Sequence, residues 1–267
     1  GRLVIEADDG IVLGDRADID LSGRTLHFFD VTKYSWGGDL VMETADGAIR
    51  QDAGSSIDVS ASENNAGSIK ATATGSGGEI LFGGALAGAA SAGFDSGAFD
   101  LRATTLADFA GLNAKLNTGG FFDARSFVIK TGDLTVGDEV RANQVTISVD
   151  GGSLTVDGKI DASGEDVGTI RLAARDDLSL TGNALLDAHG TRLATDAYGQ
   201  AIEASNRGEI ELTSRSGSVD LAPGAHTAAP ADVGHVRQLV RQHAHRALAA
   251  RRRVRPVGGA RPRPRRR

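Results

Sequence analysis

The chain has 267 residues with 36 Gly, 5 Pro and no Cys, which favours a turn-dense β architecture and excludes disulfides, thiolate metal sites and a cysteine nucleophile. Only 4% of the residues are aromatic against 40% hydrophobic, so we expect a core of small and branched aliphatic side chains. The formal net charge of −6 divides unevenly, because residues 1–225 carry 17 basic and 34 acidic side chains whereas residues 226–267 carry 12 and 1.

The chain holds no candidate for a membrane span. Its longest weakly polar stretch, 80–94, is diluted by Gly, Ala and Ser and ends at Asp95, short of the roughly 18 uncharged apolar residues that a spanning helix needs. The first residues, Gly1-Arg2-Leu3, include no initiator Met and no charged-then-apolar leader. We therefore expect an internal or C-terminal fragment of a longer secreted protein.

Short alternating runs bounded by Gly, Asp or Ser occur in threes at the start of the chain. The first three, at 3–7, 11–13 and 19–23, are followed by three similar runs at 40–44, 48–51 and 57–61. The offsets between equivalent residues are 37, 38 and 38. A set of three strands that returns in the same order is typical of a stacked repeat.

An insertion at 25–38 separates these two sets and holds most of the aromatic residues in this part of the chain. Because aromatic residues dominate binding surfaces, it is the best candidate contact surface; its rings are Phe28, Phe29, Tyr34 and Trp36. The alternative is a satellite cluster that covers the first strands. The insertion also holds the only candidate acid–base pair, His27 with Asp30, although His27 is more simply interpreted as a surface histidine.

The strand pattern stops between Phe94 and Phe127. Within this gap, apolar residues at near-helical spacing after a Thr cap predict a short helix over 104–117. We expect it to lie on the flank of the repeat domain and to bury Phe109 and Leu116 together with Phe121 and Phe122.

A second repeat is shorter. The runs 145–149, 154–156 and 160–164 return at 170–173, 178–180 and 186–190, with offsets of 25, 24 and 26 residues. A further insertion, 191–207, separates the next set. The predicted fold of residues 1–225 is an all-β, right-handed parallel β-helix, a solenoid with three short strands per coil; a β-sandwich is the less favoured alternative.

The third run of each set carries a repeated Asp. Side-chain alternation places its apolar neighbours inside and the Asp outside, at Asp20, Asp58, Asp161 and Asp187. A calcium-binding ladder is one interpretation, but the Gly-Gly-x-Gly-x-Asp repeat that forms such ladders is missing. We therefore expect these carboxylates to cap turns, and no cofactor or metal site is predicted.

Five short segments are distinctive: 93–97, 108–113, 168–174, 177–180 and Gly-Gly-Ser-Leu-Thr-Val-Asp-Gly-Lys-Ile-Asp-Ala-Ser-Gly at 151–164. With these segments the chain resembles large exoproteins of the filamentous haemagglutinin family. The resemblance covers residues 1–225. It implies an adhesin that is exported through an outer-membrane two-partner-secretion transporter, displayed on or released from a Gram-negative cell surface, and attached to a surface glycan or protein. The integrin-binding Arg-Gly-Asp loop of some members is not carried over, because this chain has Arg207-Gly208-Glu209.

The leading hypothesis is therefore a non-enzymatic structural and adhesive segment. The alternative is a carbohydrate-active β-helix enzyme, a polysaccharide lyase or hydrolase, which requires carboxylates or basic residues that converge in one groove. None of the common nucleophile, zinc-protease, phosphate-loop or dinucleotide motifs is present in the sequence.

The segment 226–267 is rich in Arg, Ala, Pro and His. Its spacing predicts a helix over 232–250, followed by a disordered Arg-Pro run. A basic arm of this kind suggests a third hypothesis, nucleic-acid binding. We favour instead an out-of-frame reading of the gene that begins near 224–231, because nothing in the acidic repeat domain anticipates this composition.

Overall fold

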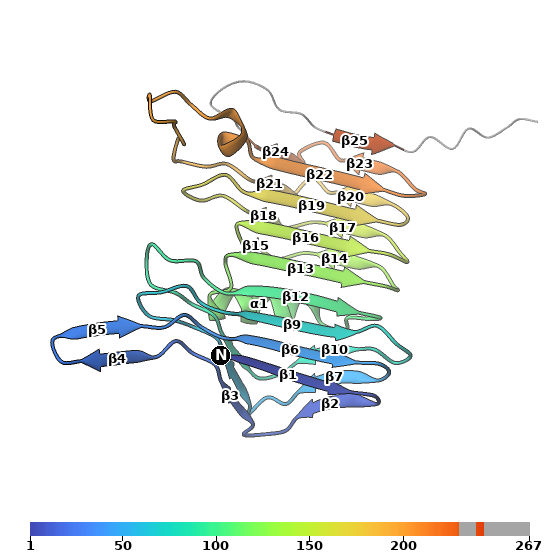
Figure 1. Ribbon diagram of the computed structural model, residues 1–267. Helices are drawn as coiled ribbons and strands as arrows, with labels where there is room; N and C mark the ends of the chain where they lie inside the picture. The colour runs from blue at the N-terminus through green and yellow to red at the C-terminus, as the bar shows by residue number, and fades with distance from the viewer. Residues whose placement is uncertain (230–238, 243–267) are drawn as a thin grey trace, which may run out of the picture.

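The computed structural model describes residues 1–229 and 239–242. It is mostly β, with 47% of these described residues in strands and 6% in helices, and its largest sheet has nine strands that all run parallel (Figure 1). The predominance of β structure expected from the sequence is confirmed.

The nine strands of this sheet lie side by side in the order in which the chain visits them. They are β1 (Arg2–Ala7), β6 (Asp39–Thr44), β9 (Ser68–Ala73), β12 (Ala98–Ala103), β13 (Ala124–Ile129), β16 (Gln144–Val149), β19 (Thr169–Ala174), β22 (Glu209–Ser214) and β25 (Leu239–Gln242).

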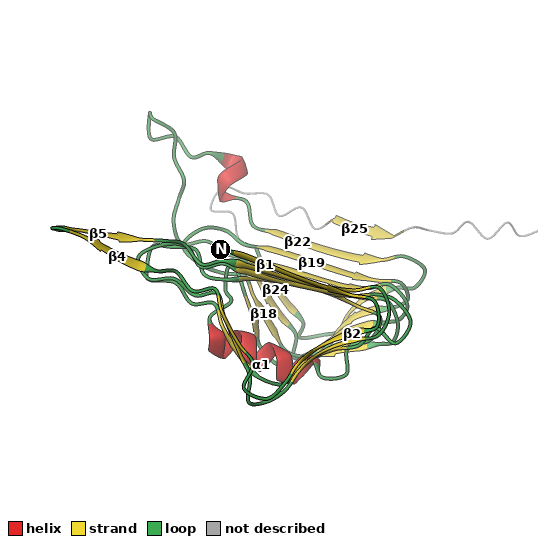
Figure 2. Cartoon of the chain, turned by 60° about the horizontal axis from the view of Figure 1, so that its bottom comes forward, coloured by secondary structure: helices red, strands yellow, loops and turns green. Residues whose placement is uncertain are grey.

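Each of these strands except β12 and β25 is followed by two shorter ones, and we call such a set of three strands a layer. The second strands form two separate sheets, β2 (Gly10–Leu13), β7 (Ala48–Gln51) and β10 (Ile80–Phe82), then β14 (Leu134–Val136), β17 (Leu154–Val156), β20 (Leu178–Leu180) and β23 (Val219–Leu221). The third strands also form two separate sheets. The first contains β3 (Asp18–Asp20), β8 (Ser56–Asp58) and β11 (Ala85–Ala87), and the second contains β15 (Val140–Arg141), β18 (Lys159–Asp161), β21 (Leu185–Asp187) and β24 (His226–Ala228). Figure 2 shows that the strands of successive layers overlie one another around a common interior.

The register between layers agrees with the alignment of the sequence repeats. In the first two layers, Leu3 pairs with Leu40, Ile11 with Ile49 and Ile19 with Ile57. In the later repeat, Val145 pairs with Ile170, Leu154 with Leu178 and Ile160 with Leu186. All six pairings are parallel, so like side chains stack on like side chains.

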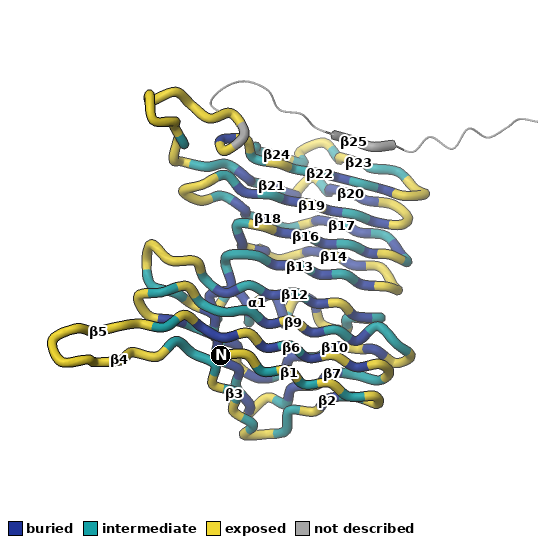
Figure 3. The backbone as a smooth tube through the Cα atoms, viewed as in Figure 1, coloured by how far each residue is buried: buried dark blue, intermediate teal, exposed yellow. Residues whose placement is uncertain are grey.

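The interior is mostly aliphatic, with buried Phe side chains near α1, and the repeated Asp residues cap turns as predicted. Ile57, Val59, Ile160, Ala162, Leu186 and Ala188 are buried (Figure 3), whereas Ile19 and Leu21 of the first layer are half-buried. Each repeated Asp accepts a hydrogen bond from the backbone N–H two residues further on. The N···O distances are 2.9 Å at Asp20, 2.8 Å at Asp58, 3.0 Å at Asp161 and 3.2 Å at Asp187.

The unit formed by β12 and the helix after it, which we count as the fourth layer, differs from the prediction. The gap between Phe94 and Phe127 is not free of strands, because β12 and the start of β13 fall in it. The helix α1 (Phe109–Gly119) begins later than predicted, since the carboxylate of Asp108 accepts the N–H of Gly111 at 2.7 Å and so caps it. Instead of lying on the flank, α1 takes the place of the second and third strands and packs against β11 and β15. It buries Phe109, Leu112 and Leu116, and Phe121 is buried nearby, but Phe122 is only half-buried.

Two insertions leave the stack on the side where the strands of the large sheet begin (Figure 1). The first is an antiparallel hairpin of β4 (Thr25–Phe28) and β5 (Val31–Tyr34). The second, 191–207, ends in the short 3₁₀ helix η1 (Glu203–Asn206), where the buried Asn206 amide hydrogen-bonds the backbone of Ala194 and Ile202.

Most of the predicted basic tail lies outside the described residues. Of the helix expected over 232–250 only Leu239–Gln242 is described, and these residues form strand β25, paired with β22, instead of a helical turn. Within 1–229 and 239–242, no helix has the length and apolar character needed to cross a membrane.

A candidate binding groove beside the aromatic hairpin

The four aromatic residues proposed as a contact surface lie on or next to the β4–β5 hairpin and are exposed. The exposed fractions are 68% for Phe28, 103% for Phe29, 39% for Tyr34 and 66% for Trp36. The rings therefore do not form a buried cluster over the first layers. Phe29 sits at the tip with a positive φ of 50°, which the reversal of the chain imposes there.

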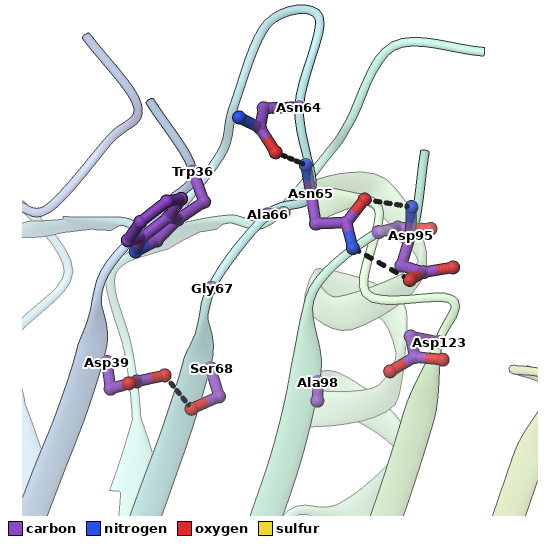
Figure 4. A pocket seen from close by; sticks show the side chains of 12 residues that line it. Trp36, Asp39, Asn64, Asn65, Ala66, Gly67, Ser68, Asp95, Ala98 and Asp123 are labelled. Atoms are coloured by element: carbon purple, nitrogen blue, oxygen red, sulfur yellow. Dashed lines mark hydrogen bonds between the residues drawn. The ribbon is translucent and has the colours of Figure 1, made fainter. Parts of the chain in front are cut away.

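Trp36 lies at the base of the hairpin and lines an open groove of about 410 Å³ (Figure 4). The groove crosses the loops that lead into β6, β9, β12 and β13. Two hydrogen bonds join two of these loops: Nδ2 of Asn65 donates to the Asp95 carboxylate at 2.9 Å, and the backbone N–H of Asp95 donates to Oδ1 of Asn65 at 3.1 Å. These hydrogen bonds fix the floor of the groove across two layers.

A second hollow of about 260 Å³ continues the first one along the same edge of the stack. The two share Asp95, Ser96 and Asp123, and the second adds Phe94 and Arg141 among its lining residues. We call the two together the edge groove. At its far end, Arg192 of the second insertion pairs with Asp166 at 2.6 Å.

The groove holds two neighbouring carboxylates with different surroundings. Partial burial raises the pKa of Asp123, and the negative charge of Asp95 raises it further. Near Trp36, the hydroxyl of Ser68 donates to the carboxylate of Asp39 at 2.6 Å. The groove thus offers carboxylate hydrogen-bond acceptors next to an exposed indole.

The predicted acid–base candidates are not brought together. His27 and Asp30 are both exposed on the hairpin, and Nδ1 of His27 lies 3.1 Å from the hydroxyl of Thr32 on the opposite strand. No hydrogen bond or ion pair within 1–229 and 239–242 joins His27 to Asp30. In the same part of the chain, no group of three His, Asp or Glu side chains is placed to hold a metal ion.

Sequence reasoning found Trp36 but missed the rest of the groove. Asn65, Asp95 and Asp123 come from loops about 30 residues apart, and each loop has its own length and sequence. Their position was the usable indication, because each of these polar residues lies in the loop just before a strand of the large sheet.

Comparisons with protein-family models, curated proteins and solved structures gave no match. The resemblance to the filamentous haemagglutinin family therefore remains a prediction from the sequence.

Proposed function

We propose that this chain is a structural and adhesive segment of a secreted or surface-displayed exoprotein of the filamentous haemagglutinin type, folded as a right-handed parallel β-helix. The observation that carries the proposal is the hairpin, which projects from the stack of layers (Figure 1) and on or beside which Phe28, Phe29, Tyr34 and Trp36 are exposed. Large exposed apolar side chains on a projection are typical of a contact surface.

Three further features support the proposal. The layers repeat with like residues in register, which allows a shaft of any length. Parallel connections of this kind are almost always right-handed. The chain has no Cys to form a bond that would obstruct export in an unfolded state. The partners proposed are an outer-membrane transporter during export and a glycan or protein on a host or bacterial cell.

The test is attachment of the purified full chain, fluorescently labelled, to a panel of epithelial and bacterial cells. The variant Phe28→Ser with Phe29→Asn removes two exposed rings while Asn tolerates the positive φ at the tip. We expect cell-bound fluorescence to fall about tenfold, as for the loss of interface aromatics worth more than 1 kcal/mol.

The matched control is Val12→Ser, which changes an apolar side chain that is 68% exposed on β2. It should bind cells like the unchanged chain. Failure of the unchanged chain to bind any cell of the panel, or full binding by the hairpin variant, would contradict the proposal.

A second candidate function is a carbohydrate-active enzyme, and the Asp95–Asp123 pair favours it. Both line the groove, and burial followed by the charge of Asp95 raises the pKa of Asp123; glycoside hydrolysis usually employs two carboxyl groups, of which the acid has a raised pKa. Incubation with neutral polysaccharides distinguishes the two functions. Release of reducing ends by the unchanged chain and not by Asp123→Asn would establish the enzyme, and no release by either would exclude it for those substrates.

A further inference from the structure

The edge groove is long and follows the axis of the stack. Its lining residues belong to the loops that precede the six consecutive strands β6, β9, β12, β13, β16 and β19. Adjacent strands in a sheet lie roughly 4.8 Å apart, so five steps give a length of about 24 Å. A groove of this length suits an extended polymer better than a compact small molecule.

The lining has the chemistry that recognises sugars. The exposed indole of Trp36 is a flat apolar platform at one end, and Phe94, 39% exposed, offers a second ring further along. Between them, Asn65, Asp95 and Asp123 present amide and carboxylate groups that exchange hydrogen bonds with hydroxyls. Binding sites for small organic ligands combine aromatic surface with a few placed polar groups in this way.

The charge of the lining selects among sugars. Five carboxylates face the groove, at Asp39, Asp95, Asp123, Glu165 and Asp166, against the single guanidinium of Arg141. Arg192 at the far end is held by Asp166 and Glu165, at 2.6 and 3.8 Å. A sulfated or uronate-rich chain would meet like charge along the whole groove and be repelled.

We propose that the edge groove binds an extended uncharged oligosaccharide of about five sugars, stacked on Trp36 at one end and hydrogen-bonded by Asn65, Asp95 and Asp123 along its length. This inference deepens the proposed adhesive function and rests on it. It adds a second contact to the one made by the hairpin tip, and it identifies the ligand of that second contact as a neutral glycan bound in the groove.

The experiment uses the full chain on an array of immobilised oligosaccharides of five or more sugars, one half neutral and the other half sulfated or uronate-containing. The neutral oligosaccharide with the strongest array response is then titrated by calorimetry against Trp36→Ala and Asp123→Asn. Each variant should weaken binding by about tenfold or more, because an aromatic anchor or a hydrogen bond to a charged group is worth at least about 1.4 kcal/mol.

Two variants serve as controls matched in chemistry. Tyr198→Ala removes an aromatic ring that is 89% exposed on the second insertion and does not line the groove. Asp9→Asn removes an exposed carboxylate at the turn between β1 and β2. Both should bind the oligosaccharide like the unchanged chain.

The outcomes separate this inference from the proposed function. Binding restricted to neutral glycans and lost in the two groove variants supports it. No binding to any neutral glycan, a preference for acidic ones, or equal loss in the control variants overturns it. If the chain still binds cells through Phe28 and Phe29 but binds no oligosaccharide on the array, the adhesive function stands and the groove inference fails.

Discussion

Asp161 and Asp123 have different roles in this protein, and their pKa values are shifted in opposite directions. Burial acts to raise the pKa of Asp161, but hydrogen bonds from Lys159 and Ser163 hold this pKa below its ordinary value of 3.8. In the groove, burial and the charge of Asp95 raise the pKa of Asp123 instead. Asp161 therefore stabilises the fold when it is ionised, whereas ionisation of Asp123 costs stability and leaves a carboxylate free to bind.

Replacement of Asp161 by Asn should lower stability in a pH-dependent way. The folded pKa of Asp161 lies below the unfolded one, so its stabilisation is present above about pH 3.8 and is lost as the pH falls through the folded value. At pH 7 we expect Asp161→Asn to lower the free energy of unfolding by about 1 kcal/mol. Urea denaturation of both proteins between pH 2.5 and 7 measures the difference, which should shrink towards zero at the acid end.

Asp9→Asn is the control, because Asp9 lies exposed at a turn and should be neutral throughout. The difference in unfolding free energy between Asp161→Asn and the unchanged chain should depend on pH. If this difference stays constant down to the lowest pH, the charge of Asp161 has no role in stability.

The capping Asp residues were predictable from the sequence, whereas the groove carboxylates were not. Asp161 and Asp187 recur at one position of a repeat, so alternation alone fixed which way they face. Asp95 and Asp123 belong to loops of unequal length and meet only because successive layers stack.

At the scale of elements, α1 separates the short parallel sheets of the first three layers from those of the later layers, while the large sheet continues past it. A buried arginine holds the helix in place. The guanidinium of Arg125 donates to the carbonyl of Phe121 and to the side chains of Asn113 and Asn117, each at 2.8 Å. Burial, and then the charge of Arg141, lowers its pKa to about 10, so it remains cationic at neutral pH.

Replacement of Arg125 by Met should therefore destabilise the protein by about 2–3 kcal/mol, because it leaves buried amide and carbonyl oxygens without a donor. Met keeps most of the volume, so a cavity contributes little. Arg102→Met on β12 is the control, since its side chain is 54% exposed, and it should stay within about 0.5 kcal/mol. Chemical denaturation measures the unfolding free energy of both variants. Similar losses in the two variants would contradict the inference that Arg125 holds α1 in place.

The sequence predicted the elements best where the repeats are regular. In layers with matching spacings, like residues stack, and the offsets alone gave the correct strand pairs. Around the fourth layer the interior is filled by aromatic rings, with Phe99 next to Phe82 and Phe121 at 5.5 and 6.2 Å between ring centres. Larger rings do not match the aliphatic pattern, which is why β12 and β13 were missed and the start of the helix was misplaced.

At the scale of the whole molecule, each layer is stabilised by its neighbours rather than by a single central core. The interior residues of the first layer have a partner layer on one side, and Leu3 and Ile5 are half-buried. Their counterparts in the second layer, Leu40 and Met42, lie between two layers and are fully buried, with 0% exposed. Burial is thus set by the position of a layer in the stack, although the residue types are nearly the same.

The pair Leu3 and Leu40 tests this directly, because the two are identical in type and pair with each other in register. Leu40→Ala opens a cavity between two layers and should cost about 3 kcal/mol, within the usual range for a buried leucine. Leu3→Ala removes a side chain that is already partly in water, so about 1 kcal/mol is expected. Denaturation of the two variants gives the ratio, and hydrogen exchange should show β1 opening before β6. Equal losses of unfolding free energy in Leu3→Ala and Leu40→Ala would contradict this account, because the position of a layer in the stack would then not affect the contribution of its side chains. The stability of a longer stack would in that case not increase layer by layer.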